Sequence, residues 1–206
     1  PYGVFSVSGS ERRCGVAIGD QILDLTSLEA DGGTTSLADK TLFQSGAWNN
    51  VMSAGPALWS DLRAHLIDGL SAASSRQQVL RSYLVPQEDV KMHLPFRVTE
   101  FTDFYAGRHH ATNVGTMFRG AENALPANWL HIPIGYNGRA STVVTSGTTI
   151  TRPSGQLKPP EATEPVFGPT NKLDFELELG AIVGAPSAMG EPVSVAEADD
   201  DFGAFY

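Results

Sequence analysis

The segment Leu173–Leu179 alternates strictly between apolar residues and carboxylates. The period of two predicts a strand with four apolar side chains on one face and Asp174, Glu176 and Glu178 on the other. Side chains two positions apart on a strand lie roughly 6–7 Å from each other, so Glu176 and Glu178 could reach one cation. Carboxylate oxygens favour a hard ion, calcium or magnesium, over zinc. The alternative is a solvent-facing strand whose charges protect a sheet edge from aggregation.

A second group of reactive residues lies between Asp103 and Asn113. If this segment is helical, Asp103 and His110 are seven residues apart and share a face, about 10 Å apart along the axis. One could then serve a metal and the other a substrate, with His110 as a general base acting on water. The alternative is that His109 and His110 are capping or surface residues.

Two further side chains could bind a substrate. Arg119 follows what we interpret as an apolar turn, Met117-Phe118, and could clamp a carboxylate by bidentate hydrogen bonds. Tyr136 precedes an Asn-Gly turn, where its hydroxyl could reach a cleft or its ring could simply pack. We interpret His65 and His93 as structural.

Several catalytic motifs are absent from the sequence. It contains no glycine-rich phosphate loop, no His-Glu-x-x-His and no Gly-x-Ser-x-Gly elbow. Cys14 lies in an expected strand and is not a candidate nucleophile. As the only cysteine, it also excludes an internal disulfide and a cysteine-cluster metal site.

The elements that must position these residues begin with a small meander. Strands are expected at residues 3–7, 14–18 and 21–25, with a two-residue hairpin link at Gly19-Asp20, and they are interpreted as part of a compact barrel. A helix is expected from Pro56 to a C-terminal cap at Gly69, and a second over residues 74–84. Residues 86–89 read as a boundary, so the predicted domains are 1–89 and 90–206.

The second domain should be largely sheet. Residues 132–139 predict a hairpin that turns at Asn137-Gly138, with residues 141–150 as its far strand. Ser194–Glu197 resembles a capping box that opens a short acidic helix. The final residues, Phe202–Tyr206, are typical of the entry to a buried strand, which indicates that this domain is truncated.

Composition narrows the class of protein. The chain of 206 residues is 41% hydrophobic and 18% charged, with a formal charge of −9, which is typical of a globular protein. The acidic balance disfavours nucleic acid and anionic membranes as partners. No apolar stretch approaches the roughly 20 residues of a membrane-spanning helix. The single cysteine and the lack of a signal sequence favour the cytoplasm, and the missing initiator methionine indicates a start inside a longer gene product.

Several runs together resemble one family. They are Thr102–Tyr105, Arg108–Gly115, Met117–Gly120, Asn128–Tyr136, Gly138–Ser141 and Lys172–Glu178, with Pro1–Ser6 and Gly15–Asp20 at the start. These runs are similar to fumarylacetoacetases of the fumarylacetoacetate hydrolase family, strongly over about residues 92–194 and weakly over about 30–90. The N-terminal domain distinguishes this family from the smaller acylpyruvate hydrolases and decarboxylases that share the acidic strand.

The resemblance implies a mainly β (α+β) protein, with a small N-terminal β-barrel followed by a mixed β-sandwich roll, assembled as a cytoplasmic homodimer. It implies hydrolysis of the C–C bond of 4-fumarylacetoacetate to fumarate and acetoacetate, the last step of tyrosine catabolism. It also implies Ca²⁺ and/or Mg²⁺ on Asp103, Glu176 and Glu178, and His110 as the general base. Substrate would be bound by Tyr105, Arg119 and Tyr136.

One departure from the family bears on activity. The family's chain continues with an Asn-Asp-Trp-Ser-Ala-Arg-Asp motif, a lysine close to the metal and a glutamate that orients the histidine, and this sequence lacks all three. Without them the histidine loses tautomer control and the metal loses a ligand, so the chain by itself should have little or no activity. The alternatives are an inactive fragment or pseudoenzyme that acts as a binding module, or another acylpyruvate hydrolase.

Overall fold

The computed structural model describes residues 1–132 and 134–198. They divide into two compact units. One unit contains residues 1–96 together with the residues from 145 onward, and the other contains residues 97–144.

The first unit is built on a five-stranded antiparallel sheet with the strand order β4-β3-β2-β1-β5. Its strands are β1 (Tyr2–Val7), β2 (Arg13–Ile18), β3 (Gln21–Asp24), β4 (Leu84–Pro86) and β5 (Val90–His93). Gly19 lies in the tight link from β2 to β3 and has φ +57°. This left-handed backbone conformation costs glycine little energy, because glycine has no Cβ. The predicted meander is confirmed.

The sheet must curl, because its two outer strands are joined by a very short link. Only the 3₁₀ turn η2 (Gln87–Asp89) separates β4 from β5. Four residues of extended chain reach about 14 Å, whereas the outer strands of a flat five-stranded sheet are about 19 Å apart. The fold is therefore a curled antiparallel sheet with a few helices, and a closed barrel remains a prediction.

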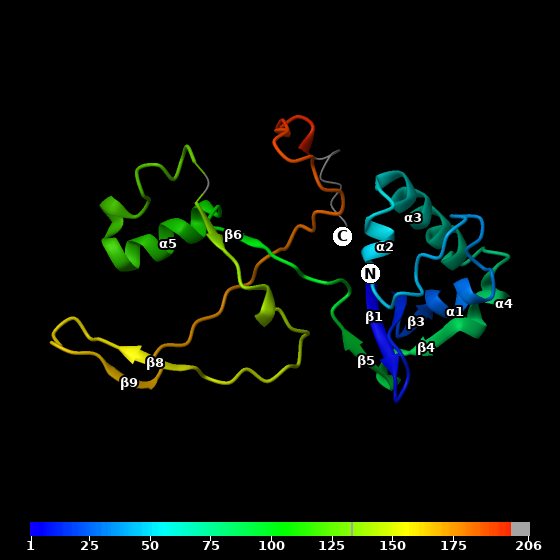
Figure 1. Cartoon of the computed structure of the whole chain (residues 1–206), viewed down its shortest axis with the longest axis horizontal. Coiled ribbons are helices and arrows are strands. Elements are labelled where there is room, and N and C mark those ends of the chain that lie inside the picture. The colour runs from blue at the N-terminus through cyan, green and yellow to red at the C-terminus, as the bar shows by residue number, and fades with distance from the viewer. Residues whose placement is uncertain (133, 199–206) are drawn as a thin grey trace. The chain divides into compact units, whose positions relative to one another are not determined.

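Helices cover this sheet and complete its core (Figure 1). They are α1 (Leu25–Ala30), α2 (Asn49–Met52), α3 (Pro56–Leu70) and α4 (Gln77–Leu80), followed by the 3₁₀ turn η1 (Arg81–Tyr83). Trp48 is fully buried at the centre, where its indole N–H donates to the Gly3 carbonyl at 2.8 Å. Its ring also contacts Tyr2 and Phe43, so one large side chain joins the sheet to the helical segment.

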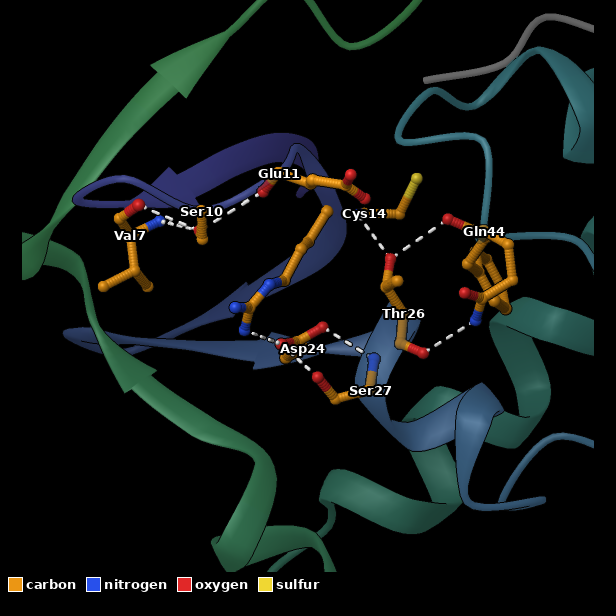
Figure 2. Close-up of polar contacts among 10 residues, drawn as sticks. Val7, Ser10, Glu11, Cys14, Asp24, Thr26, Ser27 and Gln44 are labelled. Carbon is orange, nitrogen blue, oxygen red and sulfur yellow. Dashed lines mark hydrogen bonds and ion pairs between the residues drawn. The ribbon is translucent and has the colours of Figure 1, made fainter.

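Buried polar groups fix the join between β3 and α1 (Figure 2). Asp24 caps α1 by accepting from the backbone N–H of Ser27 at 2.9 Å and from the Ser27 hydroxyl at 2.7 Å. It also forms an ion pair with Arg13 at 2.9 Å. Asp24 is nearly inaccessible to solvent, so these bonds offset the cost of burying its charge.

Cys14 lies buried in β2, as predicted. Its backbone N–H donates to the Thr26 hydroxyl at 2.9 Å (Figure 2). Burial, with the nearby carboxylates of Glu29 and Asp24, raises the pKa of its thiol to about 12. The thiol is therefore protonated at neutral pH, and a protonated thiol is a poor nucleophile.

Two helix predictions need correction. α3 continues past Gly69, which is buried inside the helix instead of capping it. A Cβ on Gly69 would lie 3.0 Å from the Leu80 side chain, so close packing explains the glycine. The second helix is much shorter than predicted, because Leu84 leaves it to pair with Leu23 in the sheet.

The first sheet also extends past the predicted domain boundary. β5 begins at Val90 and pairs with β1, and the backbone N–H of Trp48 donates to the Pro95 carbonyl at 2.9 Å. The compact unit accordingly runs to Phe96, whereas the composition change at residues 86–89 marks only the turn η2.

The unit of residues 97–144 contains a two-stranded sheet and one long helix. Its elements are β6 (Thr102–Phe104), α5 (Arg108–Arg119), the 3₁₀ turn η3 (Ala121–Asn123), β7 (Gly135–Asn137) and the 3₁₀ turn η4 (Ala140–Thr142). The hairpin predicted at Asn137-Gly138 is wrong, because β7 pairs instead with β6. Residues 141–150 form no strand; they continue η4 into an irregular segment.

After residue 144 the described chain forms one hairpin, β8 (Ser154–Leu157) with β9 (Val166–Pro169). At the predicted capping box, the Ser194 hydroxyl and the Glu197 carboxylate are hydrogen-bonded at 2.5 Å around a turn. The strand entry predicted at Phe202–Tyr206 lies outside the described residues. No helix in the described ranges is long and apolar enough to cross a membrane.

Candidate functional site

Asp103 and Tyr136 are brought together by the pairing of β6 with β7. They are direct partners in the antiparallel register. Backbone bonds from Tyr105 to Ile134 at 2.8 Å and from Gly138 to Phe101 at 3.0 Å continue the ladder on both sides. Paired residues project on the same face with Cβ atoms about 4.5–5.5 Å apart, so a half-buried carboxylate lies beside a phenol.

Tyr105 links this sheet to α5. Its hydroxyl donates to the Ala111 carbonyl at 3.1 Å, and its ring meets the His110 imidazole edge to face with 6.0 Å between ring centroids. The Trp129 indole N–H donates to the Tyr105 carbonyl at 2.8 Å. The loop between β6 and α5 is thus held at both ends, which fixes His110 close to the strand that carries Asp103.

This arrangement corrects the helical interpretation of residues 103–113. Asp103 lies in β6 and His110 in the first turn of α5, so they do not share a helix face. The helix begins only at Arg108, after Gly107. Asp103 and His110 are instead joined by the end of a strand, a short loop and the start of a helix.

Arg119 occupies a different part of the same unit. Met117 and Phe118 are helical, so Arg119 is the last residue of α5 and does not follow a turn. Its guanidinium donates to the carbonyls of Ala124 at 2.8 Å and Asn123 at 3.2 Å, which satisfies groups beyond the helix end. Nine residues separate it from His110, which puts the two on opposite faces of α5.

Close packing at Gly115 makes this helix end possible. A Cβ on Gly115 would lie only 1.8 Å from the Ala124 carbonyl oxygen. Gly115 and Ala124 are both buried, and so is Ala111 one turn before Gly115. Sequence reasoning missed this contact, and it also missed Trp129 as the residue that holds Tyr105. Gly115 and Trp129 lie within the runs that resemble the family, whereas Ala124 does not.

The acidic segment does not form the predicted strand in this structure. Among the described residues no segment pairs with 173–179, and the side chains of Phe175, Leu177 and Leu179 are more than 90% exposed. The correction has a plain cause: a strand needs a neighbour for its backbone and a surface for its apolar face. The alternation indicates which face would be buried in a strand, but no described residue covers that face.

The residues predicted to bind metal belong to different units. Asp103 lies in the unit of residues 97–144, and Glu176 and Glu178 lie in the other. Within neither unit do three described His, Cys, Asp or Glu side chains group as a metal site. The donor set itself fits a hard cation, because all three candidates offer carboxylate oxygens. Their joint role as ligands stays a prediction.

A cavity elsewhere contains none of the predicted site residues. It has a volume of about 350 Å³ and lies between β1, β2 and α3. Its lining is mostly apolar, with Arg63 among the lining residues.

A histidine and a tyrosine in contact, beside a strand that carries a half-buried carboxylate, are residue types that acid–base chemistry uses. Comparison with known protein families shows which family the chain belongs to. Residues 1–95 match the fumarylacetoacetase N-terminal family, and residues 99–201 match the fumarylacetoacetate (FAA) hydrolase C-terminal family. The chain belongs to the fumarylacetoacetate hydrolase family, which confirms the resemblance.

Curated relatives agree along nearly the whole chain. Fumarylacetoacetase of Bos taurus is 46% identical over 206 residues, covering 97% of this chain and 49% of its own length. Fumarylacetoacetase of Homo sapiens is 45% identical with the same coverage, and that of Arabidopsis thaliana is 42% identical over 210 residues, with 97% and 49% covered. The chain spans about half the length of the curated relatives it matches.

Proposed function

We propose that this chain supplies the acid–base half of a fumarylacetoacetate hydrolase, which cleaves 4-fumarylacetoacetate to fumarate and acetoacetate. The observation that carries the proposal is the contact between Tyr105 and His110 beside the strand of Asp103, in a chain whose relatives are fumarylacetoacetases. This reaction would make the protein an enzyme of tyrosine catabolism.

His110 is the proposed general base. Its imidazole removes a proton from water, and the resulting hydroxide attacks the carbonyl carbon on the fumaroyl side. The C–C bond then breaks, its electron pair leaves with the acetoacetate fragment as an enolate, and the imidazolium returns the proton to that fragment. Tyr105, which contacts the His110 ring, keeps the imidazole next to the strand that carries Asp103.

Tyr105, Arg119 and Tyr136 are the proposed substrate-binding residues. Tyr136 is exposed and lies beside Asp103, where its hydroxyl can meet a substrate oxygen. Arg119 suits a substrate carboxylate, because its guanidinium can donate two parallel hydrogen bonds. It would have to exchange its bonds to the Asn123 and Ala124 carbonyls for the substrate, so its role requires a local rearrangement at the end of α5.

Asp103, Glu176 and Glu178 are proposed to hold Ca²⁺ and/or Mg²⁺. The support is their chemistry, three carboxylates, and the resemblance of the surrounding runs to the family. When bound, such an ion polarises carbonyl oxygens as a Lewis acid. Family membership also supports a small barrel and a sandwich roll, a homodimer and a cytoplasmic location as proposals.

The test compares two histidines that are adjacent in α5. The chain is produced alone and, separately, extended by the unmatched part of the Bos taurus relative, and the conversion of 4-fumarylacetoacetate to fumarate is followed by NMR. The extended protein should be active, and His110→Ala should lower kcat about 10²–10⁴-fold. His109→Ala is the matched control and should change kcat less than about threefold. Equal loss in both variants, or an unchanged rate in His110→Ala, contradicts the proposed role.

One observation favours a second function, that of a binding module. The chain covers half of its relatives' length and leaves a row of apolar side chains uncovered at residues 173–179. A binding module would bind its partner but would not convert 4-fumarylacetoacetate, either alone or in the extended protein.

A third alternative is an acylpyruvate hydrolase. If the extended protein converts acylpyruvates faster than 4-fumarylacetoacetate, the chain belongs to the acylpyruvate hydrolases instead.

A further inference from the structure

Tyr105 is hydrogen-bonded through its backbone N–H, its carbonyl and its hydroxyl, each time to a different part of the unit of residues 97–144. Its N–H donates to the Ile134 carbonyl at 2.8 Å, which continues the pairing of β6 with β7. Its hydroxyl donates to the Ala111 carbonyl at 3.1 Å, in the first turn of α5. Its carbonyl accepts from the Trp129 indole N–H at 2.8 Å. These three bonds join a strand, a turn and a helix at one residue.

The bond from Trp129 acts where the backbone changes direction. Tyr105 lies directly after β6, at the point where the chain leaves the sheet and turns toward α5. Trp129 is half-buried and lies 24 residues further along the chain, in a turn where its own backbone N–H donates to the Pro126 carbonyl at 2.9 Å. Because that turn is closed by a hydrogen bond, the indole N–H is held in place, and it fixes the orientation of the peptide group that follows Tyr105.

The His110 side chain needs such support because burial does not restrain it. His109 and His110 are both exposed at the start of α5. The His110 imidazole meets the Tyr105 ring edge to face, with 6.0 Å between ring centroids, which is a favourable arrangement of two aromatic rings. Tyr105 therefore restrains the His110 ring through this contact, and it restrains the neighbouring backbone through its bond to Ala111.

We propose that Trp129 is a positioning residue for the proposed general base, acting through Tyr105. Its indole N–H fixes Tyr105, and Tyr105 holds the His110 imidazole in the orientation in which it can take a proton from water. A displacement of about 1 Å can lower a rate about 10²-fold, so the loss of one distant hydrogen bond can reduce catalysis. The inference rests on the proposed function for the role of His110, whereas the coupling of Trp129 to His110 can be tested without it.

The first test measures turnover in the extended protein. Trp129→Phe removes the indole donor and keeps an aromatic ring, and it should lower kcat for 4-fumarylacetoacetate about 10- to 100-fold. Adding Trp129→Phe to His110→Ala should lower kcat further by less than about twofold, because residues that act as a unit are not additive. An unchanged kcat in Trp129→Phe, or the same loss in both backgrounds, overturns the proposal.

Trp59→Phe is the matched control, because it removes the same kind of bond away from the site. The Trp59 indole N–H donates to the Val51 carbonyl at 2.7 Å, within residues 1–96. This variant should leave kcat within about twofold of the unaltered protein. If Trp59→Phe and Trp129→Phe lower kcat equally, Trp129 contributes only to stability and the proposal is wrong.

NMR of the histidine rings gives a measurement that does not depend on turnover. In the 206-residue chain alone, Trp129→Phe should move the ring signals of His110, whose shifts depend on the nearby tyrosine ring. The signals of the adjacent His109 should stay in place, and Trp59→Phe should move neither set. Unmoved His110 signals in Trp129→Phe overturn the proposal.

A second variant separates the hydrogen bond from the packing of the indole. Trp129 is replaced by 3-benzothienylalanine, which keeps the shape of tryptophan and has sulfur in place of the N–H. The His110 signals should move in this variant too, while amide exchange over Arg108–Arg119 stays within about threefold of the unaltered chain. Loss of amide protection throughout α5 would show that Trp129 only maintains the fold, which overturns the proposal.

The positioning role and the proposed function can fail separately. If the extended protein does not convert 4-fumarylacetoacetate but the His110 signals move as expected, the proposed function fails and the coupling of Trp129 to His110 stands. If the extended protein is active but Trp129→Phe changes neither kcat nor the His110 signals, the proposed function stands and the positioning role is wrong.

Discussion

Residues 1–96 and residues 97–198 have similar lengths but differ sharply in how they treat their apolar side chains. Apart from Ala111 and Ala124, all buried apolar residues of the described chain lie in 1–96. Of its 21 exposed large apolar side chains, only Ile67, Val79 and Met92 lie there. The first stretch therefore stabilises itself, whereas the stretch that carries the candidate chemistry depends on small local contacts.

In residues 97–144, candidate catalytic side chains are held in place without a large hydrophobic core. The loop before His110 is fixed by hydrogen bonds of Tyr105 and Trp129, and the end of α5 by Arg119 and by close packing at Gly115. Such contacts position individual side chains. They bury little apolar surface, which is the main source of folding free energy.

Phe43 and Phe175 offer the strongest test of the contrast, because they are the same residue type at opposite extremes of burial. Phe43 is fully buried and Phe175 is 92% exposed. Phe43→Ala should lower the free energy of unfolding of residues 1–96 by about 3–5 kcal/mol, through lost burial and the cavity left behind. Phe175→Ala should change it by less than about 0.5 kcal/mol. Urea unfolding followed by tryptophan fluorescence measures both, and similar midpoints would refute the contrast.

Gly115 tests whether the local contacts of residues 97–144 are real constraints. Gly115→Ala places a methyl group 1.8 Å from the Ala124 carbonyl oxygen, so α5 must move. We expect a loss of about 1–3 kcal/mol in the local stability of α5, measured by amide exchange over Arg108–Arg119. Gly107→Ala is the control, because its methyl would have an ordinary contact of 3.7 Å with His110. Unchanged exchange in Gly115→Ala would show that α5 has no fixed packing.

The same contrast explains which elements the sequence predicts well. The strands of residues 1–25 are predicted correctly, because their apolar residues meet partners within the same short stretch. The alternation at Leu173–Leu179 is stronger than theirs, yet it forms no strand, since pairing depends on a neighbour that the described chain does not provide. Periodicity reports the face that is to be buried and says nothing about what buries it.

The candidate site is predictable in its residue types but not in its geometry. Asp103 and His110 belong to one motif, and a helix over that motif is a natural expectation. This expectation is wrong because of a tertiary contact: the pairing of β6 with β7 places Asp103 in a strand. Likewise Asn137-Gly138 is a favourable hairpin sequence, but Gly138 instead donates to the Phe101 carbonyl as part of the pairing with β6. Local turn preference is overridden by a longer-range ladder.

The smallest expected effect concerns the histidines of residues 1–96. His65 accepts a hydrogen bond from Arg76 at 2.7 Å. Burial, and then the Arg76 charge, lowers the pKa of His65 below its usual 6.5, despite the opposing charge of Asp68. Burial, with Arg12 and Lys91, also lowers the pKa of His93, whose ring is hydrogen-bonded to Ser6 at 2.8 Å.

Because both histidines bind a proton more readily when unfolded, the stability that they contribute is complete above pH 6.5 and is lost as the pH falls from 6.5 through their folded pKa values. The urea midpoint of residues 1–96 should therefore decrease between pH 7 and pH 5.5. His65→Gln keeps a polar side chain near Arg76 and should reduce this decrease, and adding His93→Gln should reduce it further. A decrease of the same size in the double variant would show that the acid sensitivity arises elsewhere, and a rising midpoint would mean that the sign of both pKa shifts is wrong.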